Sequence, residues 1–360
     1  MDPTFPLVPI ANLLASILVI ISLISSAVRK TVNVGAALLG AWLVVSTLIT
    51  GVEAIVWRND AENRAPGWCD FSSHIIAGST VAIPACSLII ARRLHQIIQI
   101  RSVEPPTVTE KRLQLLVDLS LGLGLPIVVM GLYYIVQMSR YQVVEEVGCA
   151  SITASDDGMT ILLLNSWTIL LPAISILFYF PRLVWSFYKH QRRLNEFART
   201  TDPNSCTRSR FLRLLLIASF DVLVTLPCGV LNLVMNVKGG PLSHFWEGWS
   251  IVHSPAEWPA HLAPASLWRQ NPWYRAMVAF DQWANVVLAL AFFVLFGITH
   301  QSRALYARAF WAVAGVVGWK RPPRDEDVQS AFEESLKFNY SRRTDEFSEY
   351  VVRGSRRTWF

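Results

Sequence analysis

Residue types that commonly perform catalysis occur throughout the 360-residue chain, but their spacing matches no catalytic motif. The seven histidines are scattered, and the sequence contains no H-E-x-x-H, G-x-S-x-G or Cys-x-x-Cys motif and no glycine loop that would cradle a phosphate. Residues 276–297 lack the lysine that a retinal Schiff base would need. We therefore expect a protein that is not an enzyme and that uses no cofactor or metal.

The polar residues that stand out are embedded in long apolar stretches, where they are costly and usually face the interior of a helix bundle. They are His74, Asn165, Asp221, Asp281 and Asn285. Asp281 and Asn285 are four residues apart and share a helix face. Asp221 has two possible roles: it forms a hydrogen bond that changes when helices move, or it forms a static packing bond. For Asp281, a ligand contact and a helix anchor are both open.

The elements that must position these groups are membrane-spanning helices. Hydrophobic residues make up 52% of the chain, charged residues make up 16%, and the mean hydropathy is +0.37. A soluble domain carries about 25% charged residues. Stretches of about 20 apolar residues, enough to cross a bilayer, cover residues 7–28, 34–57, 73–98, 115–138, 159–185, 212–235 and 275–298. We expect an all-α membrane protein, with a seven-transmembrane helix bundle over residues 1–298 and a largely disordered cytoplasmic tail over residues 299–360.

Lysine and arginine set the expected orientation, because cytoplasmic loops are enriched in both. With the N-terminus outside and the C-terminus inside, the three inner loops hold fifteen basic residues and the outer segments hold six. The net charge of +6 then reflects inner loops that face anionic membrane lipids. Nucleic acid is not an expected partner.

Two cysteines fall on the predicted outer side. They are Cys69 and Cys149, whereas Cys86, Cys206 and Cys228 lie in spans or inside. The outer compartment is oxidising, so a disulfide bond can persist there. We favour a bridge between Cys69 and Cys149 over two unpaired thiols, and such a bridge would hold the second outer loop against the third helix.

The predicted outer loops are rich in tryptophan. Residues 141–147 suggest a short extended element over the outer face, and we expect residues 239–272 to fold over a pocket as a lid. The rim tryptophans are Trp57, Trp68, Trp246, Trp249, Trp258, Trp268 and Trp273. An aromatic belt at the level of the lipid headgroups explains each of them, and an apolar path into a ligand pocket is the alternative for some.

Short strings along the chain carry a family resemblance. They are VNVGAALLG at 32–40, WCD at 68–70, IPACSLIIARRL at 83–94, YIVQMSRY at 134–141, LVTLPCGV at 223–230 and FDQW at 280–283. In this order and spacing, over about residues 5–300, the sequence resembles the fungal lipopeptide mating-pheromone receptors of the a-factor type, which are class D G-protein-coupled receptors. The resemblance implies a farnesylated peptide pheromone as ligand, a heterotrimeric G protein as partner and a plasma-membrane location. A transporter or channel is the alternative class, and self-association stays open.

A receptor of this kind needs a ligand site, a movable element and an inner contact surface. The candidate ligand-binding residues are His74, Asn165, Asp281, Trp249, His253 and Trp283. Asp221 and Pro227 are the candidate switch and hinge, because a proline inside a helix frees a carbonyl and permits a kink. The candidate G-protein contacts are Arg92, Arg93, Arg192 and Arg193.

Overall fold

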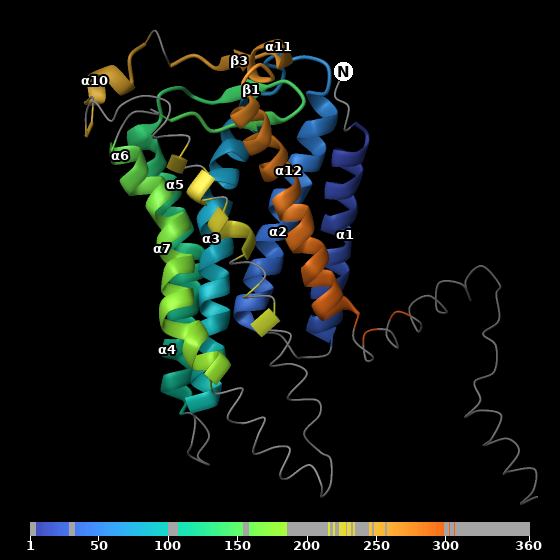
Figure 1. Ribbon diagram of the computed structural model, residues 1–360, viewed down its shortest axis with the longest axis vertical. Helices are drawn as coiled ribbons and strands as arrows, with labels where there is room; N and C mark the ends of the chain where they lie inside the picture. Colours follow the sequence, from blue (N-terminus) through green and yellow to red (C-terminus); the bar gives the residue numbers. More distant parts are fainter. Residues whose placement is uncertain are drawn as a thin grey trace, which may run out of the picture. The chain divides into compact units, whose positions relative to one another are not determined.

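The computed structural model describes residues 5–28, 33–99, 107–153 and 158–185, scattered positions between 215 and 234, residues 245–246, 248–255 and 258–298, and residues 302 and 306. Within this part of the chain, six helical segments are long and apolar enough to cross a membrane. They are Leu7–Val28, Val34–Val56, Pro66–Gln96, Val108–Val136, Gly158–Trp185 and Pro272–Gly297. Figure 1 shows them as a helix bundle with short strands at one end, which we call the sheet end.

The first three spans are single helices, α1 (Leu7–Val28), α2 (Val34–Val56) and α3 (Pro66–Gln99). The other three are built from more than one element. The fourth consists of α4 (Val108–Leu119), η1 (Ser120–Gly124) and α5 (Leu125–Val136), and the fifth includes α6 (Gly158–Thr160), η2 (Ile161–Asn165), α7 (Ser166–Ile174) and η3 (Ser175–Tyr179). The last consists of α12 (Pro272–Phe292) and η4 (Phe293–Gly297). The η elements are π-helical turns, which widen the helix locally.

Side-chain caps explain where some spans begin. Thr107 and Glu110 form a reciprocal capping box at the start of α4, so this helix begins at Val108 rather than at the predicted residue 115. Asn33 accepts a hydrogen bond from a backbone N–H at the start of α2, and Asn271 does the same for α12. These caps satisfy N–H groups that the first helical turn leaves without partners.

The helices pack around an apolar core shared by α1, α2, α3 and α12. Its buried members include Val19, Leu43, Ile90 and Phe292, one from each helix in that order. α1 also exposes large aliphatic side chains at alternating three- and four-residue spacing: Leu7, Ile10, Leu14, Ile17, Ile21, Ile24 and Val28. An exposed apolar stripe of this length is unfavourable in water, so the bundle fits a lipid surrounding.

A proline in the fourth span is compensated by a neighbouring helix. Pro126 has no N–H and cannot bond the carbonyl of Gly122, four residues earlier. That carbonyl instead accepts a hydrogen bond from Nε1 of Trp42 in α2, at 3.0 Å. The indole of Trp42 therefore satisfies, within the bundle, the carbonyl that Pro126 cannot bond.

Two predicted outer loops join in one small sheet. The elements at the sheet end are β1 (Gln142–Val144), β2 (Gly148–Ala150), α10 (Trp249–Val252), β3 (His261–Ala263) and α11 (Ala265–Trp268). β1 pairs antiparallel with β2, with Val143 opposite Cys149, and parallel with β3, with Val143 opposite Leu262. The predicted extended element within residues 141–147 is thus confirmed. The connection that leads to α12 supplies the third strand.

Two predictions fall largely outside the described residues. Of the predicted span over residues 212–235, the described positions, such as 223–227 and 229–231, are helical. The predicted tail over residues 299–360 is described only at positions 302 and 306. The seven-span count and the disorder of the tail therefore stay predictions.

Candidate functional site at the sheet end

A disulfide bond anchors the sheet to the third span. Cys69, in the first turn of α3, is bonded to Cys149 in β2, and their Cα atoms are 5.1 Å apart. The bond lies in a buried cluster with Trp57, Tyr141 and Val143. The pairing expected from the sequence is present, and it holds the β1–β2 hairpin over the start of α3.

Glu53 is a buried carboxylate beside this disulfide. It lies near the end of α2 and is 3% exposed. Its Oε1 accepts a hydrogen bond from Nε1 of Trp68 at 2.9 Å, and its Oε2 accepts one from the backbone N–H of Cys149 at 3.2 Å. A Cβ added to Gly148, whose φ is +111°, would lie 2.4 Å from the Cβ of Glu53. Glu53 therefore links α2, α3 and β2, and the close approach requires glycine at position 148.

A chain of hydrogen bonds connects the sheet to α12 and α1. Glu146 lies in the β1–β2 turn with φ of 73°, and its backbone N–H donates to the carbonyl of Trp57 at 2.8 Å. Its Oε2 accepts a hydrogen bond from Nη2 of Arg269 at 2.6 Å. Gln282 of α12 donates to the carbonyl of Glu146 at 3.3 Å, and Asn12 of α1 donates to the carbonyl of Gln282 at 3.3 Å. These bonds fix the sheet relative to the first and last spans.

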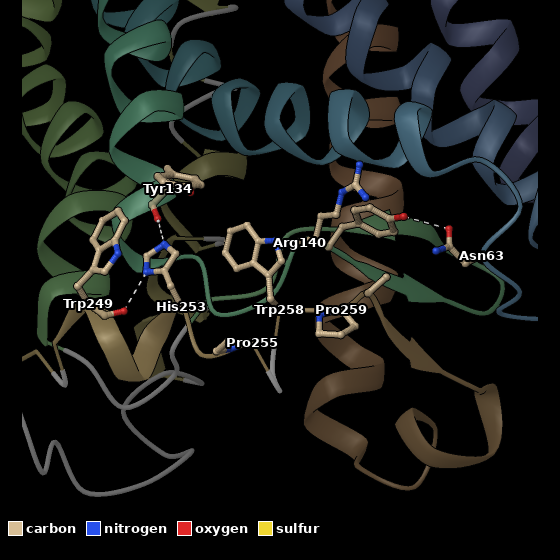
Figure 2. A pocket seen from close by; sticks show the side chains of 10 residues that line it. Asn63, Tyr134, Arg140, Trp249, His253, Pro255, Trp258 and Pro259 are labelled. Carbon is tan, nitrogen blue, oxygen red and sulfur yellow. Dashed lines mark hydrogen bonds between the residues drawn. The ribbon is translucent and has the colours of Figure 1, made fainter.

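A cleft of about 570 Å³ opens beside the sheet (Figure 2). Its lining residues are Asn63, Tyr134, Arg140, Tyr141, Trp249, His253, Pro255, Trp258, Pro259 and Ala260. Four of them form an aromatic cluster. The ring of His253 stacks on Trp249 with centroids 3.9 Å apart, and it lies 5.1 Å from the ring of Tyr134 and 5.3 Å from that of Trp258. This cluster gives one part of the cleft an aromatic wall suited to apolar groups.

The remaining part of the cleft is polar, and the charge of Arg140 in this part is paired with that of Asp70. Arg140 donates hydrogen bonds to both carboxylate oxygens of Asp70, with 2.8 Å between Nε and Oδ1. These hydrogen bonds, together with the charge of Asp70, raise the pKa of the Arg140 guanidinium above its ordinary value. The hydroxyl of Tyr141 donates to Oδ1 of Asn63 at 3.0 Å. The cleft can therefore accept a ligand that combines an apolar group with hydrogen-bonding groups.

At the opposite end of the bundle, two predicted G-protein contacts are held by a buried carboxylate. Nη1 of Arg92 lies 3.2 Å from Oδ1 of Asp118, and Nε of Arg93 donates to Oδ2 of the same residue. The Asp118 side chain is fully buried, whereas the two arginine side chains are 23% and 25% exposed. Asp118 thus links α4 to α3.

The cleft contains two of the six predicted ligand-binding residues, Trp249 and His253. His74 instead lies in α3, where its Nδ1 is 2.7 Å from the carbonyl oxygen of Asp70. Trp283 packs against the apolar core of α1, α2, α3 and α12.

The other predicted site residues lie elsewhere or outside the described residues. Asn165 lies in η2 and Asp281 lies on an exposed face of α12, and neither lines the cleft. Pro227 is helical and exposed. Asp221, Arg192 and Arg193 fall outside the described part of the chain. The switch, the hinge and the inner contact surface therefore stay predictions.

Trp57 corrects the expectation that the outer tryptophans form a belt or an apolar path. It is 1% exposed, and its Nε1 donates to the carbonyl of Glu62 at 2.9 Å. The reason is the disulfide cluster, which covers the indole. Trp258, in contrast, lines the cleft, and Trp268 donates to the carbonyl of Glu145 at 3.2 Å.

The sequence did not identify Tyr134 and Arg140 as cleft residues. It also did not identify Glu53 as the residue that links α2, α3 and β2. Two signals were present. Asp70, the partner of Arg140, directly follows Cys69, and Glu53 is a carboxylate within an otherwise apolar stretch. Neither signal identifies the partner, because each partner lies far away in the sequence.

Comparison with known proteins gives a consistent result. Residues 7–315 match the pheromone A receptor (STE3) family. A pheromone B alpha 2 receptor of Schizophyllum commune is 29% identical over 97% of this chain and 55% of the relative. Pheromone receptor 1 of Ustilago hordei is 27% identical over 77% of this chain and 76% of the relative. The pheromone a factor receptor of Saccharomyces cerevisiae is 24% identical over 77% of this chain and 56% of the relative. The chain spans about half the length of the Schizophyllum relatives that it matches.

Proposed function

Because the chain belongs to the pheromone A receptor family, we propose that it is a plasma-membrane receptor for a farnesylated peptide pheromone. On this proposal the sheet end and the N-terminus face outward, and the C-terminus faces the cytosol. The positions of lysine and arginine in the sequence support this orientation.

The observation that carries the proposal is the cleft at the sheet end. Its aromatic wall of Tyr134, Trp249 and Trp258 offers apolar area for a prenyl group. Its polar wall of Asn63 and Tyr141 offers hydrogen-bonding groups for a peptide. A prenyl chain gains about 0.8 kcal/mol for each buried methylene-sized unit, so an aromatic wall matters more to a prenylated peptide than to a bare one.

Signalling on this proposal is a shift between two helix arrangements that activates a heterotrimeric G protein. A ligand shifts such an equilibrium only by its difference in affinity for the two states. The ligand contacts elements that are joined to α1, α3 and α12 through the disulfide, Glu53 and Glu146. Movement of a cleft wall can therefore reach several spans. Arg92 and Arg93 lie at the far end of α3, where a cytosolic partner would bind.

The test is expression of the chain in a fungal strain that lacks its own pheromone receptor. Synthetic peptides ending in farnesyl-cysteine are compared with the same peptides without the farnesyl group, and a G-protein-dependent reporter is read. We expect a response to a farnesylated peptide and a potency loss of at least about tenfold in Trp249→Ala, the size of an interface hot spot. Trp273→Ala is the matched control, because Trp273 is 52% exposed and Trp249 is 50% exposed, but only Trp249 lines the cleft.

Two outcomes would contradict the proposal. A bare peptide as potent as the farnesylated one would remove the prenyl group from the ligand. Solute or ion flux through proteoliposomes without any peptide would favour the alternative class, a transporter or channel.

A further inference from the structure

His253 lies in the cleft, and the number of hydrogen bonds that its ring donates depends on whether the imidazole is protonated. Nδ1 of His253 lies 3.3 Å from the carbonyl oxygen of Trp249, and Nε2 lies 3.0 Å from the carbonyl oxygen of Tyr134. Figure 2 shows the two contacts on opposite sides of the ring. A carbonyl oxygen only accepts hydrogen bonds, so each contact requires an N–H on the imidazole. A neutral imidazole has one N–H and an imidazolium has two.

The rings around His253 favour the same charge state. The imidazole stacks on Trp249 with 17° between the ring planes, and the rings of Tyr134 and Trp258 lie within 5.3 Å of it. The faces of aromatic rings attract cations, and tryptophan does so most strongly. Two carbonyl acceptors and a stacked indole therefore form a site built for a protonated histidine.

We propose that protonated His253 is a clasp that holds α10 and its neighbouring tryptophans against the end of α5. His253 is then a positioning residue, because it fixes the aromatic wall of the cleft. Deprotonation turns one ring nitrogen into an acceptor that faces a carbonyl oxygen, and the repulsion between them opens the clasp. Closure takes up a proton, so a fall in pH strengthens the clasp. The relevant range is about pH 8 to 5, in which imidazoles change charge.

Other titratable groups lie at the cleft. Among the described residues that line it or bind its lining, they are Arg140, Asp70, the hydroxyls of Tyr134 and Tyr141, and His261, whose backbone N–H donates to the carbonyl of Tyr141. Arginine, aspartate and tyrosine side chains in general keep their charge between about pH 5 and 8. The other imidazole among them is that of His261, so a pH response of the aromatic wall that His253→Gln abolishes comes from His253.

The test is hydrogen–deuterium exchange of the full purified chain in detergent, without any ligand, at about pH 5.5 and about pH 8. The reporters are the backbone amides of Val252 and His253, which donate to the carbonyls of Gly248, the residue before α10, and of Trp249, its first residue. After correction for the intrinsic pH dependence of exchange, we expect about tenfold slower exchange at the lower pH, the size expected of a charge-assisted hydrogen bond.

Three variants sharpen the test. His253→Gln removes the titratable ring and should exchange fast at both pH values. His253→Arg keeps a planar cation with several donors and should exchange slowly at both. His74→Gln is the matched control and should keep the wild-type pH dependence. Nδ1 of His74 faces one carbonyl, that of Asp70, which a neutral ring can satisfy.

Wild-type exchange that does not change with pH would overturn the proposal, and so would a His253→Gln variant that behaves as wild type. The link from the clasp to ligand affinity rests on the proposed function. The exchange experiment uses no pheromone, so it stands or fails independently of the peptide assay. A closed clasp with no response to any peptide would refute the receptor function and leave the clasp intact.

Discussion

Each end of the bundle joins two segments through an aspartate and arginine, but the two contacts differ in burial. At the sheet end, the side chains of Asp70 and Arg140 are 33% and 48% exposed. At the opposite end, Asp118 is fully buried between Arg92 and Arg93. Exposed ion pairs contribute about 0.2–1 kcal/mol, whereas removing one partner from a buried pair costs about 3–5 kcal/mol.

The aspartate–arginine contacts therefore have different roles at the two ends. At the sheet end, the disulfide and the strands hold the elements together, so the Asp70–Arg140 pair is not needed for this and instead sets the polarity of the cleft. At the contact between α3 and α4, the buried charge itself holds the helices. The predictions below test this difference from the largest effect to the smallest.

The largest effect is expected from Asp118→Asn. Arg92 and Arg93 would keep most of their burial and lose their counter-charge. The free energy of unfolding should fall by about 3–5 kcal/mol, measured by thermal unfolding of the purified protein. Asp70→Asn is the matched control at the sheet end. Equal losses in the two variants would contradict the contrast between buried and exposed pairs.

Cys69→Ser should have the next largest effect, a loss of about 2–4 kcal/mol, because the hairpin would no longer be bonded to α3. Surface expression and pheromone response should both fall. Cys149→Ser should match it, and the double variant should be no worse than either single variant. Wild-type expression and response in Cys69→Ser would show that the bond does not support the sheet end.

Glu53→Gln should cost about 1–3 kcal/mol. Both oxygens of Glu53 accept hydrogen bonds, and an amide would bring its own N–H toward either Trp68 or Cys149. Unfolding temperature is the measurement. Glu62→Gln is the control, because the side chain of Glu62 is 71% exposed. A Glu53→Gln variant as stable as that control would mean that Glu53 does not stabilise the contact between α2, α3 and β2.

The smallest effect is expected for the exposed pair. A double-mutant cycle with Asp70→Asn and Arg140→Gln should give a coupling of about 0.2–1 kcal/mol. The coupling should shrink as salt is added, because solvent ions screen exposed charges. A coupling above that range, or one that salt leaves unchanged, would place this pair with the buried one.

The sequence was sufficient for features that depend on local pattern or on topology. Apolar stretches of bilayer length predict the spans, and the side on which Cys69 and Cys149 fall predicts their bond. The parallel pairing of β1 with β3 could not be predicted, because strands of three residues carry little pattern and the pairing joins distant segments. The contacts of Glu53 could not be predicted either, because they also join distant segments. One of its donors, the N–H of Cys149, is 96 residues away.

The pairing of β1 with β3 also constrains the order of assembly during synthesis. The disulfide needs only the chain up to Cys149, and the β1–β2 hairpin needs only the chain up to Ala150. β3 starts at His261, so it emerges from the ribosome after the hairpin is already available as a template. The end of the bundle that carries the cleft is therefore completed late, by a strand that docks onto a preformed edge.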